Sequence, residues 1–489
     1  MKKILLILLL IIGLTTSLYA QWVSPGEGVT YTLPDLVAAT EGVVTNDGTV
    51  FTIHQDLTIS RNDALLIDDQ VTRINAPGVL ITVKGSLNCN ITGDRVKLYG
   101  TETQKFSMRF ENATNCLMSK MYLSDGAGVQ VVESDVTFDD VKFVYFSTDY
   151  CHAAIDIFNC DPIINNCYFL LNEGAAISSP ANGQSSPQIT NCELDANVDG
   201  LNVPQINLGP GGDDTIRIIG NNIHGTWATF HTGGISVADL MGIGDTKVLL
   251  KDNIVKDGRY GYNQQGMTIS SVIEGNQFLN NNHEDNPMNG GSGISIYGTS
   301  TNNKAILRNN TITGNLWGIT AIYYHSIDMG TEDDFGYNSL YDNGNDGVTY
   351  ALYNNANSSM TAIGNYWGGD TEEFAESVIY HRPDLGDAYG MVLYSPLLTE
   401  EQINILENKE NTTNIYPNPT HDILTVESQN PIREISIFDQ IGRTIYVETR
   451  CTTSLQSQRT LNTSSLPVGI YILKIVTDHG METAKFVKN

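Results

Sequence analysis

Positive charge is scarce in this sequence. Its 489 residues include 27 Lys and Arg against 55 Asp and Glu, a formal net charge of -28. A chain of that charge repels phosphate backbones, which argues against nucleic acid as a partner. Charged residues of both signs make up only 17% of the chain, too few for a disordered acidic polymer. The composition favours a folded protein that works outside the cell.

Long apolar runs are absent beyond the N-terminus. Lys2 and Lys3 precede an apolar stretch at residues 4–14, and mostly small or polar residues follow as far as Ala20. That stretch is shorter than the ~20 residues that span a bilayer. A basic start, a short apolar core and a small residue at the end are typical of a secretory signal peptide. We predict a signal peptide at residues 1–20 and no transmembrane span after its cleavage.

Cysteine is also infrequent, and its spacing matches no metal site. None of the seven cysteines forms the C-x-x-C pairs that zinc sites use. An exported protein can form disulfides, so their pairing stays open. We interpret most of the six in the first half as small buried residues, and Cys451 lies apart. The six are Cys89, Cys116, Cys151, Cys160, Cys167 and Cys192.

What the sequence does contain is an internal repeat. A small residue, an aliphatic residue, a polar residue and a mostly apolar residue recur at steps of 22 to 34 residues. These copies begin at Gly128, Ala154, Ala176, Gly200, Gly234, Gly266, Gly293, Gly318 and Gly347. A second motif in phase with the first has Asn, Cys or Asp, then any residue, then a large apolar one. Its copies begin at Cys167, Cys192, Asn221, Asp252, Asn276, Asn310, Asn338 and Asn365.

Both motifs alternate with period 2, which predicts short strands rather than helices. A repeat of variable length suits a coil whose turns accept insertions, and stacked coils place equivalent strands in parallel, ~4.8 Å apart. Asn at a corner can hydrogen-bond to the Asn of the next coil. A leucine-rich horseshoe needs a tighter repeat, and a propeller blade needs ~40 residues. We predict an all-β solenoid over residues 21–398, capped by helices near residues 34–40 and 371–380. The second helix would begin with a capping box of Asp370 and Glu373.

From about Asp56 to Leu398 the sequence resembles the pectin-lyase-like right-handed parallel β-helix proteins of secreted bacterial origin. The resemblance rests on both motifs, on Asn365-Tyr-Trp-Gly368 and on the closing segment from Ser377 to Pro396. It implies a right-handed parallel β-helix. Because that family includes polysaccharide lyases, glycoside hydrolases and adhesins, the fold does not determine the activity.

The composition changes after Leu398. Residues 399–413 are polar and acidic and read as a linker, and residues 414–489 carry the short alternating strands of a small β-sandwich. This segment resembles the C-terminal sorting domain of type IX secretion cargo through Tyr416-Pro-Asn-Pro419, Pro467-Val-Gly-Ile-Tyr471 and Lys485-Phe-Val-Lys488. The resemblance implies export by the type IX machinery and release from, or attachment to, the outer cell surface.

No acid–base set stands out in the repeat. The polar position of the first motif and the outward position before it contain no Lys, Arg or His from Gln130 to Thr349. A uronate lyase needs a cation and a base, roles that Lys251 or Arg259 and Tyr260 would fill, with Lys256 and Tyr262 close by in sequence. An inverting hydrolase needs two carboxyls ~6.5–9.5 Å apart. Asp156 and Asp199 fit this poorly, because they lie on different rows and two coils apart. No catalytic residue is assigned.

Other candidates lie in insertions. Asp213-Asp214 and Asp333-Asp334 offer oxygen ligands for Ca²⁺, although solvated loop charges are the simpler interpretation, and no other cofactor is predicted. His231 and His283 are isolated loop histidines. Aromatic residues that follow the second motif could stack on sugar rings if they face one side: Tyr145, Trp227, Tyr260 and Trp317.

These observations favour an exported β-helix protein that binds a glycan or another surface without catalysis. The alternative is a polysaccharide lyase or glycoside hydrolase acting on acidic polysaccharide, and a third option is an adhesin stalk. An enzyme would need a cleft. The insertions at residues 204–215, 283–292 and 327–335 are the segments that would build one.

Overall fold

The computed structural model describes residues 21–198, 202–226, 231–284, 289–407, 413–428, 431–438, 444–449, 458–477 and 480–489. The predicted signal peptide therefore lies outside the described residues, as do Asp199, Trp227 and Cys451. The chain divides into two compact units, Met1–Glu400 and Glu401–Asn489. Among the described residues, no helix is both long and apolar enough to cross a membrane.

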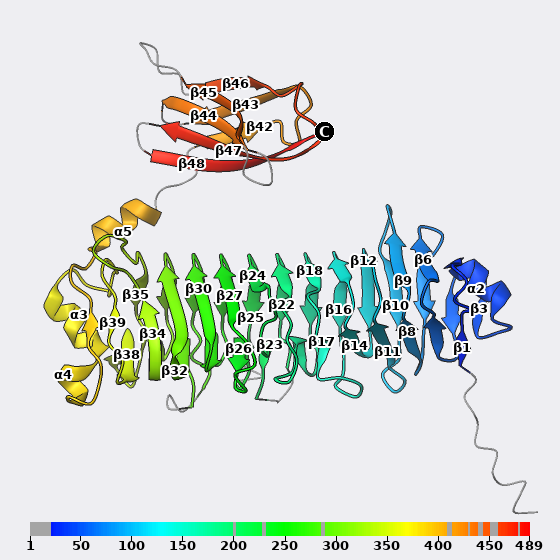
Figure 1. Ribbon diagram of the computed structural model, residues 1–489, viewed down its shortest axis with the longest axis horizontal. Coiled ribbons are helices and arrows are strands. Elements are labelled where there is room, and N and C mark those ends of the chain that lie inside the picture. Colours follow the sequence, from blue (N-terminus) through cyan, green and yellow to red (C-terminus); the bar gives the residue numbers. More distant parts are fainter. Residues whose placement is uncertain are drawn as a thin grey trace, which may run out of the picture. The chain divides into compact units, whose positions relative to one another are not determined.

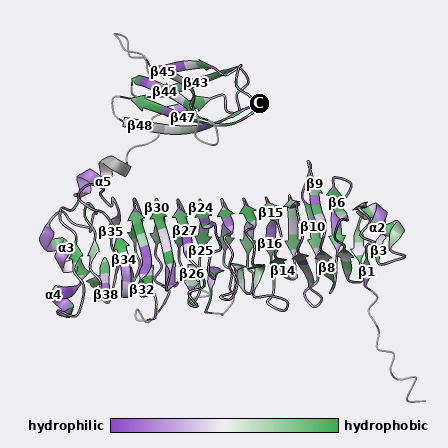
Figure 2. Cartoon of the chain, viewed as in Figure 1, coloured by the Kyte–Doolittle hydropathy of each residue, from purple (hydrophilic) through white to green (hydrophobic). Residues whose placement is uncertain are grey.

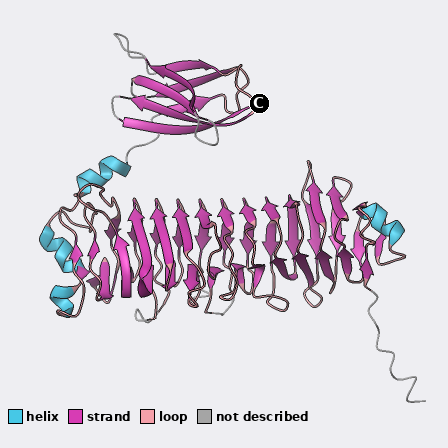
Figure 3. Ribbon diagram, viewed as in Figure 1, coloured by secondary structure: helices cyan, strands magenta, loops and turns pink. Residues whose placement is uncertain are grey.

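The first unit is a right-handed parallel β-helix, as the sequence predicts (Figure 1, Figure 3). Each coil contributes up to three strands, and these strands pair in parallel with the equivalent strands of the next coil. The exception is β3 (Val44–Asn46), which pairs antiparallel with β4 (Phe51–Ile53). The strands therefore form three series, one on each side of the tube.

The first series consists of β1 (Trp22–Val23), β5 (Leu57–Ile59), β8 (Leu80–Val83), β11 (Phe106–Glu111), β14 (Gly126–Val132), β17 (Ala153–Phe158), β20 (Ala175–Ser178), β23 (Pro204–Leu208), β26 (Gly233–Asp239), β29 (Tyr262–Gly266), β32 (Ser292–Arg308), β34 (Trp317–Asp328), β38 (Leu352–Ala356) and β40 (Ile379–Tyr380). The second series consists of β2 (Thr30–Thr32), β6 (Ala64–Asp68), β9 (Ser86–Asn90), β12 (Cys116–Ser119), β15 (Val136–Asp139), β18 (Ile163–Asn165), β21 (Gln188–Thr190), β24 (Thr215–Ile219), β27 (Thr246–Lys251), β30 (Ile269–Glu274), the last parts of β32 and β34, β39 (Met360–Thr361) and β41 (Val392–Leu393). The third series consists of β3 (Val44–Asn46), β4 (Phe51–Ile53), β7 (Arg73–Asn75), β10 (Val96–Tyr99), β13 (Met121–Ser124), β16 (Lys142–Val144), β19 (Tyr168–Leu170), β22 (Glu193–Asp195), β25 (Asn222–His224), β28 (Ile254–Lys256), β31 (Gln277–Leu279), β33 (Thr311–Thr313) and β35 (Ser339–Tyr341).

The interior of the tube is lined by stacked aliphatic and aromatic side chains. Val129, Ile155, Ile235 and Ile294 are 0% exposed, and Val129 pairs directly with Ile155. Apolar residues accordingly concentrate in the strands (Figure 2). Burying one such side chain contributes about 1.5–3 kcal/mol, so each coil is stabilised mainly through the coils on either side of it.

An asparagine ladder runs along the corner before the third series. Asn221, Asn253, Asn276, Asn310 and Asn338 each donate through Nδ2 to the Oδ1 of the next ladder asparagine, over 2.8–3.0 Å. The ladder ends at Asn365. Each of these buried amides also donates to a backbone carbonyl of the preceding coil. The stacking of corner asparagines expected from the second motif is thus observed.

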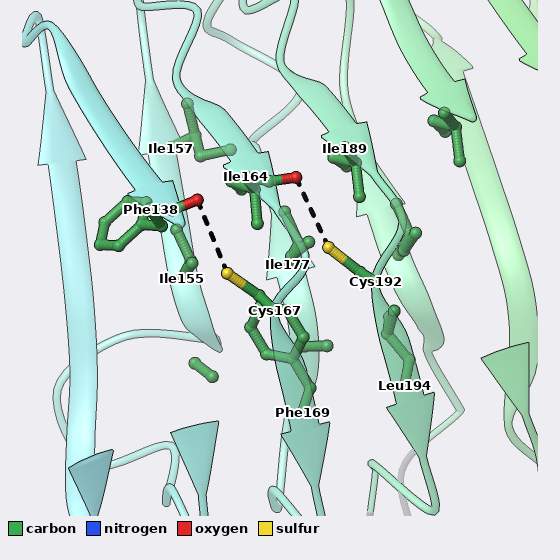
Figure 4. Close-up of a cluster of buried hydrophobic side chains, with 14 of the residues drawn as sticks. Phe138, Ile155, Ile157, Ile164, Cys167, Phe169, Ile177, Ile189, Cys192 and Leu194 are labelled. Carbon is green, nitrogen blue, oxygen red and sulfur yellow. Dashed lines mark hydrogen bonds between the residues drawn. The ribbon is translucent and has the colours of Figure 1, made fainter. Parts of the chain in front are cut away.

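Earlier in the tube the same corner position is occupied by cysteine. Cys167 and Cys192 are buried, and their thiols lie 3.6 Å and 3.5 Å from the carbonyl oxygens of Phe138 and Ile164 (Figure 4). All six cysteines of the described residues are free thiols, and five of them are buried. Cys160 is half-buried. Their role is packing, as interpreted from the sequence.

Three copies of the first motif were wrongly assigned. In the coil of Gly266, Tyr262 pairs with Ile235 and Ile294, so β29 precedes the motif. In the coil of Gly200, Ile206 is the stacked residue, and in the coil of Gly347 it is Leu352. Gly347 belongs instead to a hairpin of β36 (Gly344–Asn345) and β37 (Val348–Thr349). The reason is that a strand forms where its apolar side chains pack on those of the neighbouring coils. A turn can contain the same small–aliphatic–polar sequence without any such packing.

The second motif needs one correction of the same kind. Asn253 rather than Asp252 occupies the ladder, and Val255 pairs with Ile223 and Phe278. Asp252 adopts a φ of 53°, as Gly220 (68°) and Gly275 (67°) do immediately before the ladder asparagines of the neighbouring coils, so it is the turn residue and Asn253 occupies the corner.

Short helices lie at both ends of the tube. At the N-terminal end, α2 (Leu33–Ala39) starts at a capping box of Thr32 and Asp35, and it buries Leu33 and Leu36. At the other end, α3 (Glu372–Val378) is capped by the Thr371 hydroxyl, which accepts from Phe374 N at 3.2 Å. The predicted capping box of Asp370 and Glu373 is therefore wrong: the helix is capped one residue later, and Phe374 has no polar side chain to complete a box. A single turn, α4 (Arg382–Leu385), follows.

The second unit consists of two small antiparallel sheets, preceded by α5 (Glu400–Glu407) in the predicted linker. One sheet contains β42 (Thr413–Tyr416), β43 (Ile423–Ser428) and β46 (Gln458–Asn462). The other contains β44 (Ile432–Phe438), β45 (Thr444–Thr449), β47 (Gly469–Thr477) and β48 (Gly480–Lys488). Its sequence motifs have structural roles: Asn418 hydrogen-bonds to Lys485 O and Val487 N at 2.9 Å, and Tyr471 donates to Pro467 O at 2.8 Å.

Candidate functional site

A groove of about 360 Å³ lies on the outward face of the first series. Its floor is formed by outward side chains of β29, β32, β34 and β38, and its rim by the turns that lead into these strands. The residues lining it are Asn202, Arg259, Tyr260, Asn263, Gln265, Asn289, Gly290, Ser292, Ser295, Trp317, Thr320, Ile322, Tyr353 and Asn355.

The floor is a ladder of amides and hydroxyls. Asn263 pairs with Ser295, which pairs with Thr320, so the three side chains lie in successive coils, ~4.8 Å apart. Ser292 and Thr320 share a hydrogen bond of 2.8 Å between their hydroxyl oxygens. The polar position of the first motif, two residues after its small residue, predicts Ser295 and Thr320 for this row, as observed. It also predicts Thr268 and Thr349, where the structure places Asn263 and Tyr353.

One end of the groove is walled by aromatic rings. The Trp317 ring lies 5.4 Å from Tyr353 at an interplanar angle of 21° and 4.4 Å from Tyr350. Tyr350 continues to Tyr380 at 5.1 Å. All four side chains are half-buried, so each presents part of a ring to solvent. Of these four residues, only Trp317 could be predicted from the sequence. The tyrosines lie in coils where the motif assigned the wrong residues to the strand.

Arg259 is the charged group of the groove, and it is held by a buried carboxylate. Its Nε lies 3.1 Å from an oxygen of Glu284, whose side chain is 7% exposed. Its Nη atoms donate to Asn202 Oδ1 and to the carbonyl of Asn289. His231 Nδ1 lies 3.9 Å from the same Glu284 oxygen. The guanidinium is therefore fixed in orientation, while Glu284 offsets its charge.

The lyase set considered from the sequence does not assemble. Lys251 ends β27 on the second series and is paired with Glu274 at 3.1 Å, Lys256 ends β28 on the third series, and Arg259 reaches the first. Tyr260 does line the groove, but burial raises the pKa of its phenol to about 12. Its ring fills the space where a Cβ on Gly233 would lie. Tyr262 is completely buried in the tube.

The carboxylate candidates are also dispersed. Asp156 lies on the first series, where it accepts a hydrogen bond of 2.8 Å from Ser178, and burial raises its pKa. Asp199 lies outside the described residues. The same outward row contains a cation that sequence reasoning missed, since Arg109 pairs with Gln130 one coil before the first copy of the motif. It forms an ion pair of 2.9 Å with Glu111.

The proposed Ca²⁺ ligands do not meet one another. Asp213 and Asp214 are exposed, and Asp334 is paired with Arg308 at 2.8 Å. Within the part of the chain that the structure describes, no group of three or more His, Cys, Asp or Glu is placed to hold a metal ion. His283 is buried beside Glu284 in sequence, and burial lowers its pKa.

Two of the four aromatic candidates meet in the groove, namely Tyr260 and Trp317. Tyr145 follows the third-series strand β16 and is 49% exposed, and Trp227 lies outside the described residues. Of the three insertions expected to build a cleft, only residues 283–292 supply lining residues, through Asn289, Gly290 and Ser292.

Comparison with known proteins identifies the C-terminal unit. Residues 414–489 match the secretion system C-terminal sorting domain, which confirms the type IX resemblance. Residues 243–371 match a protein family of unknown function, DUF1565. No curated protein matches the sequence.

Several solved structures are similar to this chain at low identity. The periplasmic alginate epimerase AlgG has 10% identity and a TM-score of 0.43, over 76% of this chain and 84% of its own. The tailspike protein gp49 of the Acinetobacter baumannii bacteriophage Fri1, a capsular polysaccharide depolymerase, has 11% identity and a TM-score of 0.34, over 96% and 78%. A mannuronic acid specific polysaccharide family 6 lyase from human gut microbiota has 12% identity and a TM-score of 0.26, over 78% and 94%.

Proposed function

We propose that this exported β-helix protein works at the outer cell surface or after release, and that its groove binds a glycan without altering it chemically. The observation that carries the proposal is the stacked pair of Trp317 and Tyr353, which both line the groove beside a floor of amides and hydroxyls, with Tyr350 against the Trp317 ring. A sugar ring has an apolar face that stacks on an aromatic ring and hydroxyls at its edge that hydrogen-bond to such groups. The C-terminal sorting domain supports an extracellular site of action.

The charges of the groove support binding rather than catalysis. Its described lining residues include a single cation, Arg259, and that cation is already paired with Glu284 at 3.1 Å. A uronate lyase must neutralise a substrate carboxylate and abstract a proton, which requires uncompensated positive charge and an available base. Tyr260, with a pKa of about 12, is a weak candidate for that base near neutral pH. We expect the ligand to be neutral or weakly charged and rich in hydroxyls.

One observation favours the alternative, a polysaccharide lyase or hydrolase. Arg259, Glu284 and His231 lie together at the rim, with the Glu284 oxygen 3.1 Å from Arg259 Nε and 3.9 Å from His231 Nδ1. A buried carboxylate beside an arginine and a histidine is an arrangement that acid–base catalysis uses. If the groove is catalytic, Glu284→Gln should abolish product formation while ligand binding persists.

Glycan binding can be tested on the mature chain with a glycan array followed by calorimetry. We expect Trp317→Ala to weaken binding of the selected glycan by about tenfold, near 1.4 kcal/mol, because the ring loses its stacking face. Tyr324→Ala is the matched control. It removes a 45% exposed aromatic from the same strand, β34, outside the groove lining.

Two outcomes would contradict the proposal. The first is that the neutral or weakly charged glycan selected on the array binds equally well to wild type and Trp317→Ala. The second is a new reducing end or unsaturated uronate after incubation with neutral and uronic polysaccharides, with and without Ca²⁺, when the product is lost in Glu284→Gln or Arg259→Gln.

A further inference from the structure

A second surface, on the third series, has a different chemistry from the groove. The side chains at alternate positions of β7, β10, β13, β16 and β19 form two rows along the tube, and all but Ser124 and Val144 are at least partly exposed. One row is Arg73, Lys97, Tyr122, Lys142 and Tyr168, and the other is Asn75, Tyr99, Ser124, Val144 and Leu170. These ten positions include three cations and three tyrosines but no carboxylate. Arg73, Lys97, Lys142, Tyr99, Tyr122 and Tyr168 are called the cation–tyrosine face below.

Aromatic rings rather than carboxylates hold two of these cations, Arg73 and Lys142. The guanidinium carbon of Arg73 lies 4.6 Å above the Tyr99 ring, and Lys142 Nζ lies 5.2 Å from the centre of the Tyr168 ring. Tyr99 and Tyr122 are 5.9 Å apart. Among the described residues, Arg73, Lys97 and Lys142 form no ion pair, whereas Arg109, Lys251 and Arg308 each do. A cation–π contact orients a cation and leaves its charge uncompensated.

This positive surface ends at an acidic coil. On the next strand, β22, the equivalent positions are Glu193 and Asp195. At this boundary lies a depression of about 360 Å³, lined by the Arg95–Asp140 ion pair, by Glu193 and by Lys142, Tyr168, Asn166 and Asn191. In a chain of net charge -28, such a surface attracts an anion locally while the surrounding acidic coils repel anions elsewhere.

We propose that the cation–tyrosine face binds an anionic polysaccharide lying along the axis of the tube. Its carboxylate or sulfate groups would contact Arg73, Lys97 and Lys142, and its sugar rings would stack on Tyr99, Tyr122 and Tyr168. This site is independent of the groove, since it occupies the third series rather than the first.

The spacing of the cations favours a polysaccharide over a nucleic acid. Arg73 and Lys97 lie one coil apart and Lys97 and Lys142 two coils apart, so the charges are separated by ~5 and ~10 Å. Duplex DNA carries one negative charge per ~1.7 Å of axis, and that density would also bring phosphates against Glu193 and Asp195. A polysaccharide with one charge on every sugar, or on every second sugar, has a charge spacing close to that of the three cations. It also places fewer negative charges against Glu193 and Asp195.

The test compares the mature full chain with two charge-matched triple variants. The first variant, Arg73→Gln, Lys97→Gln and Lys142→Gln, removes the face. The second, Arg217→Gln, Lys247→Gln and Lys304→Gln, removes three cations from the second series. Binding to polygalacturonate, heparin, dextran and single-stranded DNA is measured by calorimetry over a range of salt concentrations.

We expect wild type and the second variant to bind polygalacturonate or heparin, with no binding to dextran at this face. The first variant should lose at least about tenfold in affinity, and the slope of log K against log salt should fall by about one per cation removed, as for other linear polyanions. Tyr122→Leu should weaken binding about threefold and leave the slope unchanged, because it removes stacking and no charge.

Three results would overturn the proposal. One is the failure of wild type to bind either anionic polysaccharide at low salt. Another is an equal loss in both triple variants, which would indicate attraction by overall charge alone. The third is single-stranded DNA binding as tightly as the polysaccharides. None of these depends on the groove, because Trp317→Ala leaves the face unchanged.

Discussion

Replacing Asn276 by alanine tests whether the corner ladder holds the coils together. Its side chain is 0% exposed. Its Nδ2 donates to Asn310 Oδ1 at 3.0 Å and to Leu250 O at 2.8 Å. Its Oδ1 accepts from both the backbone N and the Nδ2 of Asn253, at 3.0 and 2.9 Å. One amide thus connects three successive coils.

The expected loss of stability follows from the hydrogen-bond partners that Asn276 leaves unsatisfied. In Asn276→Ala the buried N–H of Asn253 loses its acceptor, which costs about 1–3 kcal/mol. The hydrogen bonds to Asn253 Nδ2 and Leu250 O are worth about 1 kcal/mol each. Asn310 Oδ1 keeps the backbone N–H of residue 276 as a donor, so no further group is orphaned there. We expect a loss of about 3–5 kcal/mol in the free energy of unfolding.

The chain allows the β-helix to be followed separately from the sorting domain. All four tryptophans, at positions 22, 227, 317 and 367, precede residue 400. Tryptophan fluorescence during denaturant titration of the mature protein therefore reports on the first unit alone. Gln277→Ala is the matched control, because Gln277 is the adjacent residue, points outward and is exposed. Its change should stay within about 0.5 kcal/mol.

A loss of less than about 1 kcal/mol in Asn276→Ala, or a loss equal to that of Gln277→Ala, would refute this reasoning. Either would mean that the amides of the ladder fill the corner without binding the coils to one another.

Other consequences of the structure can be checked directly. Burial raises the pKa of Cys89 and Cys151 to about 12, so iodoacetamide at about pH 8 should modify neither until the chain unfolds; modification of either peptide in the native protein would contradict this. Burial lowers the pKa of His325, so the unfolded chain takes up a proton below about pH 6.5 more readily than the folded chain, and stability should fall as the pH drops through that value. The dependence should weaken in His325→Gln, and an unchanged pH profile would show that another group governs it. Asn418→Ala removes two hydrogen bonds to β48, so hydrogen exchange of the last strand should accelerate; equal protection in the variant would argue against this anchor.

The general architecture could be predicted from the repeat, because each coil of a solenoid has the same structural requirements and therefore a similar sequence. Each coil must bury aliphatic residues at alternate positions, and a buried corner amide must find a partner in the next coil, so both requirements recur in the chain. The sorting domain could be predicted from the sequence equally well. Its motifs are structural, since Asn418 anchors the last strand and Tyr471 closes on Pro467.

Which side chains share a face was decided only by the tertiary structure. Turns of different length can contain a small–aliphatic–polar sequence, as at Gly266, and the interior accepts Tyr262 because its neighbours above and below are Ile235 and Ile294. Lys251 and Arg259 are eight positions apart, yet they lie on different sides of the tube, because the chain turns two corners between them, one before and one after β28. Arg73, Lys97 and Lys142 span 70 positions and share one face. Proximity in a β-helix depends on the number of complete coils between two residues, and only the folded stack sets that number.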